Sequence, residues 1–151
     1  MTVRVRALEA SDAARAEALV RAGLAGTRYE MRALEIIASA LTSPPDEFRG
    51  IVALTRDGSV SGVLVYGPLA GADTMEKLHI LAGADDTLDA LIASLVAARR
   101  GKARMIVCEL PADLPFEPAR RALERAAFRC EGSVEGLFTP SIGLKVYVLR
   151  Y

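Results

Sequence analysis

The chain has 151 residues, which allows one domain with a substantial apolar core and leaves little room for a second. We therefore expect a single domain over residues 1–151. Lys and Arg together number 19, as do Asp and Glu, so the formal net charge is zero. Because no overall charge favours an anionic partner, the composition argues against binding to nucleic acid or to membranes.

The sequence contains no apolar run near the roughly 20 residues that a membrane-spanning helix needs, and its first residues alternate like a strand rather than like a targeting segment. Cys108 and Cys130 both fall in predicted strands, which favours two reduced thiols. We expect a cytoplasmic protein without a metal site. Abundant Ala and Arg beside very few lysines are typical of a bacterial gene rich in G and C.

The first forty residues predict a strand and two helices. Val3 and Val5 alternate with arginines, as in a half-exposed strand, and Ser11 can cap a helix over about residues 12–22. A second helix is predicted over about residues 29–41. It would bury one apolar face formed by Met31, Leu34, Ile37, Ala38 and Leu41.

A hairpin should follow the second helix. Pro44 and Pro45 are expected to end that helix, because proline cannot continue the backbone hydrogen bonding. Residues 50–55 and 60–66 are apolar strands, and the Asp57-Gly58 pair between them is typical of a tight two-residue turn.

Residues 74–110 predict a strand, a helix and a second strand arranged as a parallel βαβ unit. Strand 74–82 is followed by a helix that begins near Asp86 and then by strand 105–110. The helix should bury the stripe Leu88, Leu91, Ile92, Leu95 and Val96. The start of such a helix often binds an anion, since free N–H groups and the helix dipole converge there.

The C-terminal third predicts a helix over about residues 117–126 and a closing hairpin of strands 128–138 and 143–150. The complete order is strand, two helices, three strands, helix, strand, helix and two strands. The sequence thus predicts an α/β (α+β) fold, in which a mixed, mostly antiparallel sheet of about seven strands is flanked by about four helices.

Three segments carry a resemblance to a known family. The segment FEPARRALERAAF is similar to the helix Y-x-P-T-R-x-F-Y-E-R-x-G-F of the GCN5-related N-acetyltransferase (GNAT) superfamily, with matches at Pro118, Arg120, Glu124, Arg125 and Phe128. GVLVYGPLAGADTME and the ending EGLFTPSIGLKVYVLRY are similar to segments of one small bacterial branch. The resemblance covers essentially the whole chain and implies the acyl-coenzyme A N-acyltransferase fold.

The resemblance also implies transfer of an acetyl group from acetyl-coenzyme A to a primary amine of a small molecule or protein. A carboxylate usually removes the proton of the amine, and the matching positions are Glu76 and Glu109. Two alternatives stay open. Both glutamates can be ordinary surface charges, and His79 can act as a base, although a lone histidine in an apolar strand is more often a hydrogen-bonded core residue.

The family's usual acid, which protonates the departing thiolate, is a tyrosine on the last helix. Leu123 takes its place here and cannot donate a proton. Tyr147 or Tyr66 would have to replace it, or solvent would supply the proton, because a coenzyme A thiolate is a fairly good leaving group.

The family's pyrophosphate-binding loop, Q/R-x-x-G-x-G/A, is not matched by the segment LAGADDTLDA. The resemblance assigns contacts with acetyl-coenzyme A to Leu81, Ala82, Gly83, Ala84, Thr87 and Leu88. Asp85 and Asp86 would oppose a phosphate. At an effective dielectric of about 20, one carboxylate about 5 Å from one phosphate charge costs roughly 3 kcal/mol before salt screening. Either aspartate can instead cap the helix with its own carboxylate.

The sequence therefore leaves two functions open. The first is an acetyl-coenzyme A-dependent N-acetyltransferase with Glu76 or Glu109 as base. The alternative is a degenerate, non-catalytic binding or protein-interaction module of the same fold that has lost acetyl-coenzyme A, acting as a homodimer or beside a catalytic partner. The loop over residues 82–88 discriminates between them, because free amides facing an open cleft favour the enzyme.

Overall fold

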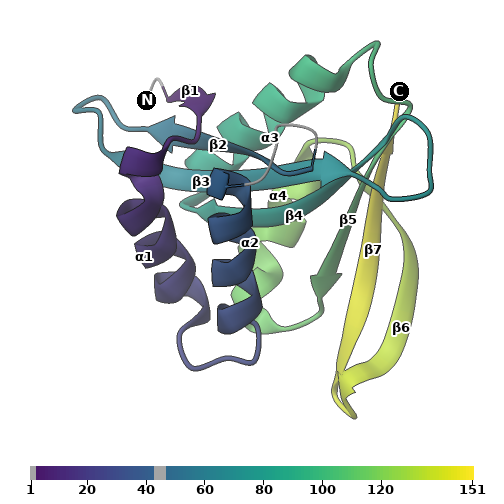
Figure 1. Cartoon of the computed structure of the whole chain (residues 1–151). Coiled ribbons are helices and arrows are strands. Elements are labelled where there is room, and N and C mark those ends of the chain that lie inside the picture. The colour runs from purple at the N-terminus through teal and green to yellow at the C-terminus, as the bar shows by residue number, and fades with distance from the viewer. Residues whose placement is uncertain (1–2, 43–46) are drawn as a thin grey trace.

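A seven-stranded sheet forms the centre of the molecule (Figure 1), seen in a computed structural model that describes residues 3–42 and 47–151. The strands are β1 (Arg4–Ala7), β2 (Arg49–Leu54), β3 (Val60–Pro68), β4 (Met75–Gly83), β5 (Met105–Pro111), β6 (Arg129–Thr139) and β7 (Ile142–Arg150). They lie in the order β1-β2-β3-β4-β5-β7-β6, with β4 and β5 parallel and the other described pairs antiparallel. The predicted mixed sheet and βαβ unit are confirmed.

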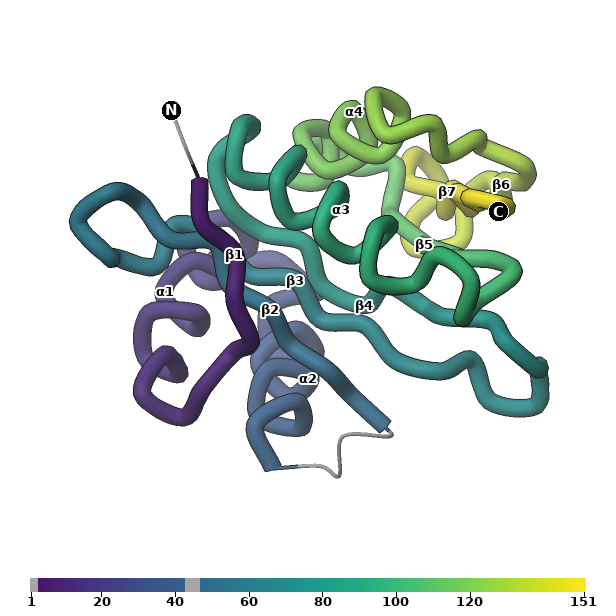
Figure 2. Tube along the Cα trace, turned by 90° about the horizontal axis from the view of Figure 1, so that it is seen from above, coloured from purple at the N-terminus to yellow at the C-terminus, as the bar shows by residue number. Residues whose placement is uncertain are grey.

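Four helices cover the two faces of the sheet. They are α1 (Ala13–Leu24), α2 (Glu30–Thr42), α3 (Asp85–Arg99) and α4 (Glu117–Arg125), with short 3-10 turns at Ala10–Asp12 and Leu114–Phe116. Figure 2 shows α1 and α2 on one face and α3 and α4 on the other. Each face has its own apolar core against the sheet. Within the described ranges, no helix is both long and apolar enough to cross a membrane.

The buried face of α2 matches the predicted one in part. The helix buries Ala33, Ile36 and Ile37, and Leu34 and Leu41 pack against the same core. Met31, however, is 73% exposed, and Ala38 is also exposed. Two overlapping apolar stripes fit the helical period, and packing against β2 and β3 selects the stripe that contains both isoleucines. Pro44 and Pro45, predicted to end this helix, lie outside the described residues.

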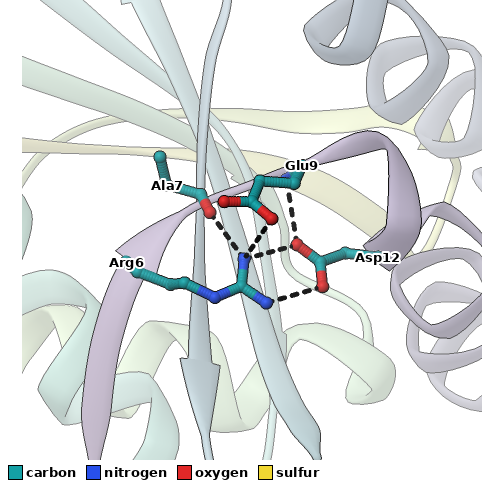
Figure 3. A network of polar contacts seen from close by, with 4 residues as sticks. All are labelled: Arg6, Ala7, Glu9 and Asp12. Atoms are coloured by element: carbon teal, nitrogen blue, oxygen red, sulfur yellow. Dashed lines mark hydrogen bonds and ion pairs between the residues drawn. The ribbon is translucent and has the colours of Figure 1, made fainter.

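Asp12, rather than the predicted cap Ser11, holds the start of α1. Figure 3 shows the guanidinium of Arg6 donating to both carboxylate oxygens of Asp12, at 2.7 and 2.9 Å. The backbone N–H of Glu9 donates to the same carboxylate at 2.9 Å. These hydrogen bonds, that of Arg6 above all, lower the pKa of the buried Asp12 from its ordinary value of 3.8. Asp12 is the last residue of a 3-10 turn that precedes α1, and Ala13 is the first residue of the helix.

We expect Asp12→Asn to lower the stability of the fold at pH 7. Because the folded-state pKa of Asp12 lies below its unfolded value, its stabilising contribution is complete above pH 3.8 and is lost as the pH falls through the folded-state pKa. Urea unfolding at several pH values should show the gap between wild type and variant narrowing on acidification below pH 3.8. A constant gap would contradict this account. Glu135→Gln, an exposed change on β6, serves as control.

At His79, the alternation of β4 shifts by one residue, so the side chains that follow point to the other face of the sheet than alternation predicts. Val65 pairs with Ile80 and Tyr66 pairs with Leu78, so His79 is an extra residue in β4, a β-bulge. Before the bulge, Leu78 belongs to the core under α3 and α4. At the bulge, His79 packs against Phe48, and Ile80 joins the core under α1 and α2. Such bulges re-aim side chains beside functional sites.

Candidate functional site

A cavity lies where β4 and β5 separate. The two strands pair only through residues 75–78 and 105–108, and Figure 1 shows β5 and β7 turning away from β4 beyond that ladder. The opening contains a cavity of about 280 Å³, here called the strand-gap cavity. Side chains from β4, β5 and all four helices line it, and nearly all of them are apolar. Such a lining suits a largely apolar part of a ligand.

A second and more polar cavity adjoins the first. It has a volume of about 400 Å³ and lies beside the N-terminal half of α2, so we call it the α2 cavity. Its polar lining consists of Arg28, Tyr29, Arg32, His79 and Glu109. Leu24, Ala33, His79, Ile80, Leu110 and Phe116 line both cavities. A molecule in one cavity can therefore meet a molecule in the other.

His79 lies at the junction of the two cavities, with its ring 5.0 Å from that of Phe48. Burial above all, together with the positive charges of Lys77 and Arg32, lowers the pKa of its imidazole from 6.5 to about 4. The imidazole is therefore neutral at pH 7. It can donate or accept a hydrogen bond there and adds no positive charge that would repel an ammonium group.

We expect the imidazole of His79 to titrate with a pKa of about 4. His79 is the one histidine of the chain, so its ring protons can be followed by NMR without ambiguity. Between about pH 4 and 6.5 the unfolded chain binds the proton more readily, so stability should rise with pH in this window. His79→Phe should reduce that slope. Titration near 6.5 would show that the ring is solvated and would contradict the structure.

Glu109, one of the two predicted catalytic glutamates, lines the α2 cavity. Its neighbours Cys108 and Leu110 are buried under α3 and α4, so the alternation of β5 turns Glu109 to the opposite face. Glu109 Oε2 accepts a charge-assisted hydrogen bond from Lys77 Nζ at 2.8 Å, and the side chain is 42% exposed. The carboxylate is thus held in place and open to solvent.

Glu76, the other predicted catalytic glutamate, lies on the other face of the sheet. Its Oε1 is 2.6 Å from Nη2 of Arg99 on α3, and the two side chains are only 9% and 14% exposed. Glu76 Oε2 and Arg99 Nε have no hydrogen-bond partner within the described residues. Glu76 lines neither cavity, so the structure does not bring the two glutamates together.

The start of α3 is held close to the sheet by two glycines. A Cβ at Gly62 would lie 2.1 Å from Cγ2 of Thr87, and a Cβ at Gly83 would lie 2.8 Å from the carbonyl oxygen of Ser61. Gly83 also has a φ of +148°, which other residues rarely adopt. Thr87 fills the space beneath the helix and is buried. The first turn of α3 therefore sits directly on β3 and β4.

The amides at the start of α3 are only partly free. The N–H of Thr87 donates to Asp86 Oδ1 at 3.0 Å, and the N–H of Leu88 donates to the carbonyl oxygen of Ala84 at 2.9 Å. Asp86 thus engages an amide with its own carboxylate, as the sequence suggested, although the capping position is Ala84. Asp85 and Asp86 are exposed, and their own amides have no intrahelical acceptor.

The six predicted cofactor contacts divide into two groups. Leu81, Ala82, Gly83 and Leu88 line the strand-gap cavity. Ala84 is exposed at the capping position of α3, and Thr87 is buried against the sheet. The second group is therefore close to the cavity without lining it.

Neither Leu123, which replaces the family's acid, nor the two tyrosines that could substitute for it lines a cavity. Leu123 is fully buried in the core under α3 and α4, where Tyr66 also lies. The hydroxyl of Tyr147 donates to Glu124 Oε1 at 3.3 Å. Burial, with the nearby charge of Glu124, raises the pKa of Tyr147 to about 12. Neither Tyr147 nor Tyr66 lines either cavity.

Sequence reasoning missed Arg28, Tyr29 and Arg32, which line the α2 cavity. The ring of Tyr29 makes edge contacts with Phe116 at 5.0 Å and Phe138 at 5.5 Å. Arg28 and Tyr29 lie in the turn just before α2 and Arg32 lies in its first turn, where the sequence shows only an ordinary polar segment. Their spacing of i, i+1 and i+4 can be read from the sequence, but no neighbouring residue indicates that these side chains line a cavity.

Known structures resemble the chain over nearly its whole length, although no protein-family model and no curated protein sequence matches it. A protein of Desulfovibrio desulfuricans assigned to the acetyltransferases of the GNAT family is 22% identical, with 99% of each chain covered and a TM-score of 0.82. NAA60 of Arabidopsis thaliana, solved with a bisubstrate analogue, is 18% identical, with 99% and 98% covered and a TM-score of 0.75. An N-acetyltransferase from Staphylococcus aureus Mu50 is 15% identical, with 99% of each chain covered and a TM-score of 0.76.

Proposed function

The chain has the fold of the GCN5-related N-acetyltransferases, and we propose that it transfers an acetyl group from acetyl-coenzyme A to a primary amine. One observation carries the proposal: an apolar cavity between the separated β4 and β5 adjoins a polar cavity that contains Glu109. The first suits the acyl-bearing arm of the cofactor and the second suits an amine. The similar Arabidopsis protein has also been solved with acetyl-coenzyme A, which supports this kind of cofactor.

The residues present fit the cofactor in part. Leu81, Ala82, Gly83 and Leu88 would contact its apolar arm in the strand-gap cavity. The exposed amides at the start of α3 would face its phosphates, but the carboxylates of Asp85 and Asp86 stand at the same place. When bound, acetyl-coenzyme A supplies an activated acyl group. We expect its affinity to be limited by these two like charges.

We propose that Glu109 is the general base and that Glu76 has a structural role. Glu109 lines the cavity assigned to the amine, and Lys77 fixes the position of its carboxylate, which can accept a proton from an ammonium group. Glu76 is engaged by Arg99 on the opposite face of the sheet. The neutral ring of His79 can hydrogen-bond to the amine nitrogen at the junction of the cavities.

Titration calorimetry with acetyl-coenzyme A at low and moderate salt tests the proposal. Binding in the micromolar range, followed by acetylation of an amine, is the expected result. No binding up to millimolar concentration would favour the cofactor-free binding module instead, since the fold alone does not fix the function.

Removal of the carboxylates of Asp85 and Asp86 tests whether their charge limits the affinity for acetyl-coenzyme A. Asp85→Gly combined with Asp86→Asn should raise the affinity for acetyl-coenzyme A, with a larger gain at low salt because salt screens the repulsion. Asp73→Asn is a matched control, because this exposed aspartate precedes β4 at the end away from the start of α3. Equal affinities in all three proteins would mean that the loop shape, and not its charge, limits binding.

A further inference from the structure

Three side chains with hydrogen-bond donors line the α2 cavity together. Arg28 and Tyr29 lie in the turn just before α2, and Arg32 lies in the first turn of the helix. Nη1 of Arg28 donates to the carbonyl oxygen of Phe138 at 2.7 Å, which ties the side chain to β6. Nη1 of Arg32 is held by Glu35 Oε2 at 3.1 Å. Each guanidinium carries five N–H groups, so both retain donors for a further partner.

The hydroxyl of Tyr29 is the second observation. It is buried and has no hydrogen-bond partner within the described residues. Phe116 and Phe138 pack against the ring by edge contacts. A buried polar group without a partner is costly, and a small movement of the ring, which lines the α2 cavity, would bring the hydroxyl to an acceptor atom of a ligand there.

The charged side chains of the α2 cavity favour an anion. Arg28 and Arg32 line it, and Glu109, which Lys77 engages, is the one acidic side chain among the described residues that line it. Glu35 and Asp113 lie nearby but do not line the cavity. At His79 the positive charges of Lys77 and Arg32, which lower the pKa of the ring, outweigh the negative charge of Glu109, which raises it.

We propose that the acceptor is a small amine that also carries a carboxylate or a similar oxyanion, as an amino acid does. The anionic group binds to Arg28, Arg32 and the hydroxyl of Tyr29, while the ammonium group lies toward Glu109 at the gap between β4 and β5. A cavity of about 400 Å³ accommodates such a molecule. This inference rests on the proposed function for the transfer step, but binding of the acceptor can be tested without it.

The first experiment measures binding by NMR in the absence of acetyl-coenzyme A. The probes are the free L-amino acids and, for each, the primary amine that remains when the carboxylate is removed. We expect amino acids to shift the amide signals of Arg28, Tyr29 and Arg32 and the decarboxylated amines to shift them at least tenfold more weakly at equal concentration. If no amino acid shifts these signals, the inference is wrong, whatever the outcome of acyl transfer.

The second experiment measures kcat/KM for acetylation of the same pairs. Arg28→Gln, Arg32→Gln and Tyr29→Phe should each reduce the preference for the amino acid over its decarboxylated amine, by about tenfold for the arginine variants. Arg21→Gln removes the same charge from α1 outside the cavity and should keep the wild-type preference. Since Arg28 and Arg32 are exposed, these variants should fold normally.

The possible outcomes separate the inference from the proposed function. Efficient acetylation without any preference for the carboxylate, or acetylation confined to peptide N-termini, would overturn the inference and leave the transferase intact. Binding of amino acids that Arg28→Gln weakens, without any acyl transfer, would support the anion site and count against the transferase.

Discussion

Glu109→Gln should lower kcat/KM for acetyl transfer by about 10²- to 10⁴-fold, the range that general base catalysis contributes. Glutamine has nearly the same shape and can still accept the hydrogen bond from Lys77, so the cavity should keep its form. The variant loses only the capacity to take a proton from the ammonium group. The measurement is release of the coenzyme A thiol together with mass spectrometry of the acetylated amine.

The pH dependence distinguishes a base from a merely structural residue. As the pH approaches the pKa of the acceptor amine, more of the amine is already neutral, so the gap between Glu109→Gln and wild type should narrow. Glu135→Gln, on the exposed strand β6, is the matched control and should behave as wild type. Unchanged turnover in Glu109→Gln at neutral pH would exclude Glu109 as the base, and His79→Phe would then be the next variant to measure.

Glu76→Gln should lower the free energy of unfolding by about 3 kcal/mol, while folded molecules keep their acetyl-transfer activity. The substitution leaves the guanidinium of Arg99 buried without its counter-charge, and breaking a buried ion pair on one side is strongly destabilising. Urea unfolding gives the stability, and turnover measured well below the unfolding transition gives the activity of the folded form.

Two further variants separate the buried pair from a general effect of charge. Glu131→Gln breaks the exposed pair with Arg150 and should change stability by less than about 1 kcal/mol. Glu76→Leu combined with Arg99→Met removes both buried charges and should be more stable than Glu76→Gln alone. A folded Glu76→Gln protein without activity would contradict this account and restore Glu76 as the catalytic base.

Local patterns in the sequence were sufficient for the order of the elements. The Asp57-Gly58 pair predicted the β2–β3 hairpin, and the apolar period of residues 88–96 predicted the buried stripe of α3, of which Leu88, Leu91, Ile92 and Leu95 are buried. Both signals depend on neighbouring residues alone. The resemblance to the GNAT superfamily added the topology of the sheet, which the structure confirms.

Local patterns were not sufficient to place the side chains of the site. Strict alternation puts Glu76, Leu78 and Ile80 on one face of β4, but the bulge at His79 moves Ile80 to the other face. No glycine or proline marks the bulge, since the hydrogen bonds that create it are made with β3. The opposite orientations of Glu76 and Glu109 come from the pairing of β4 with β5, because Glu76 lies beside Ile106 and Glu109 follows Ile106 by an odd number of residues.

By itself, the sequence determined the helices, the strands and the fold family, because hydrophobic period, turn residues and motif spacing are local properties of the chain. The tertiary structure alone decided which glutamate lines a cavity and that Arg28, Tyr29 and Arg32 line the same cavity as Glu109. These residues meet because β4 and β5 separate and α2 packs beside the gap. That arrangement depends on long-range packing, which no stretch of sequence encodes alone.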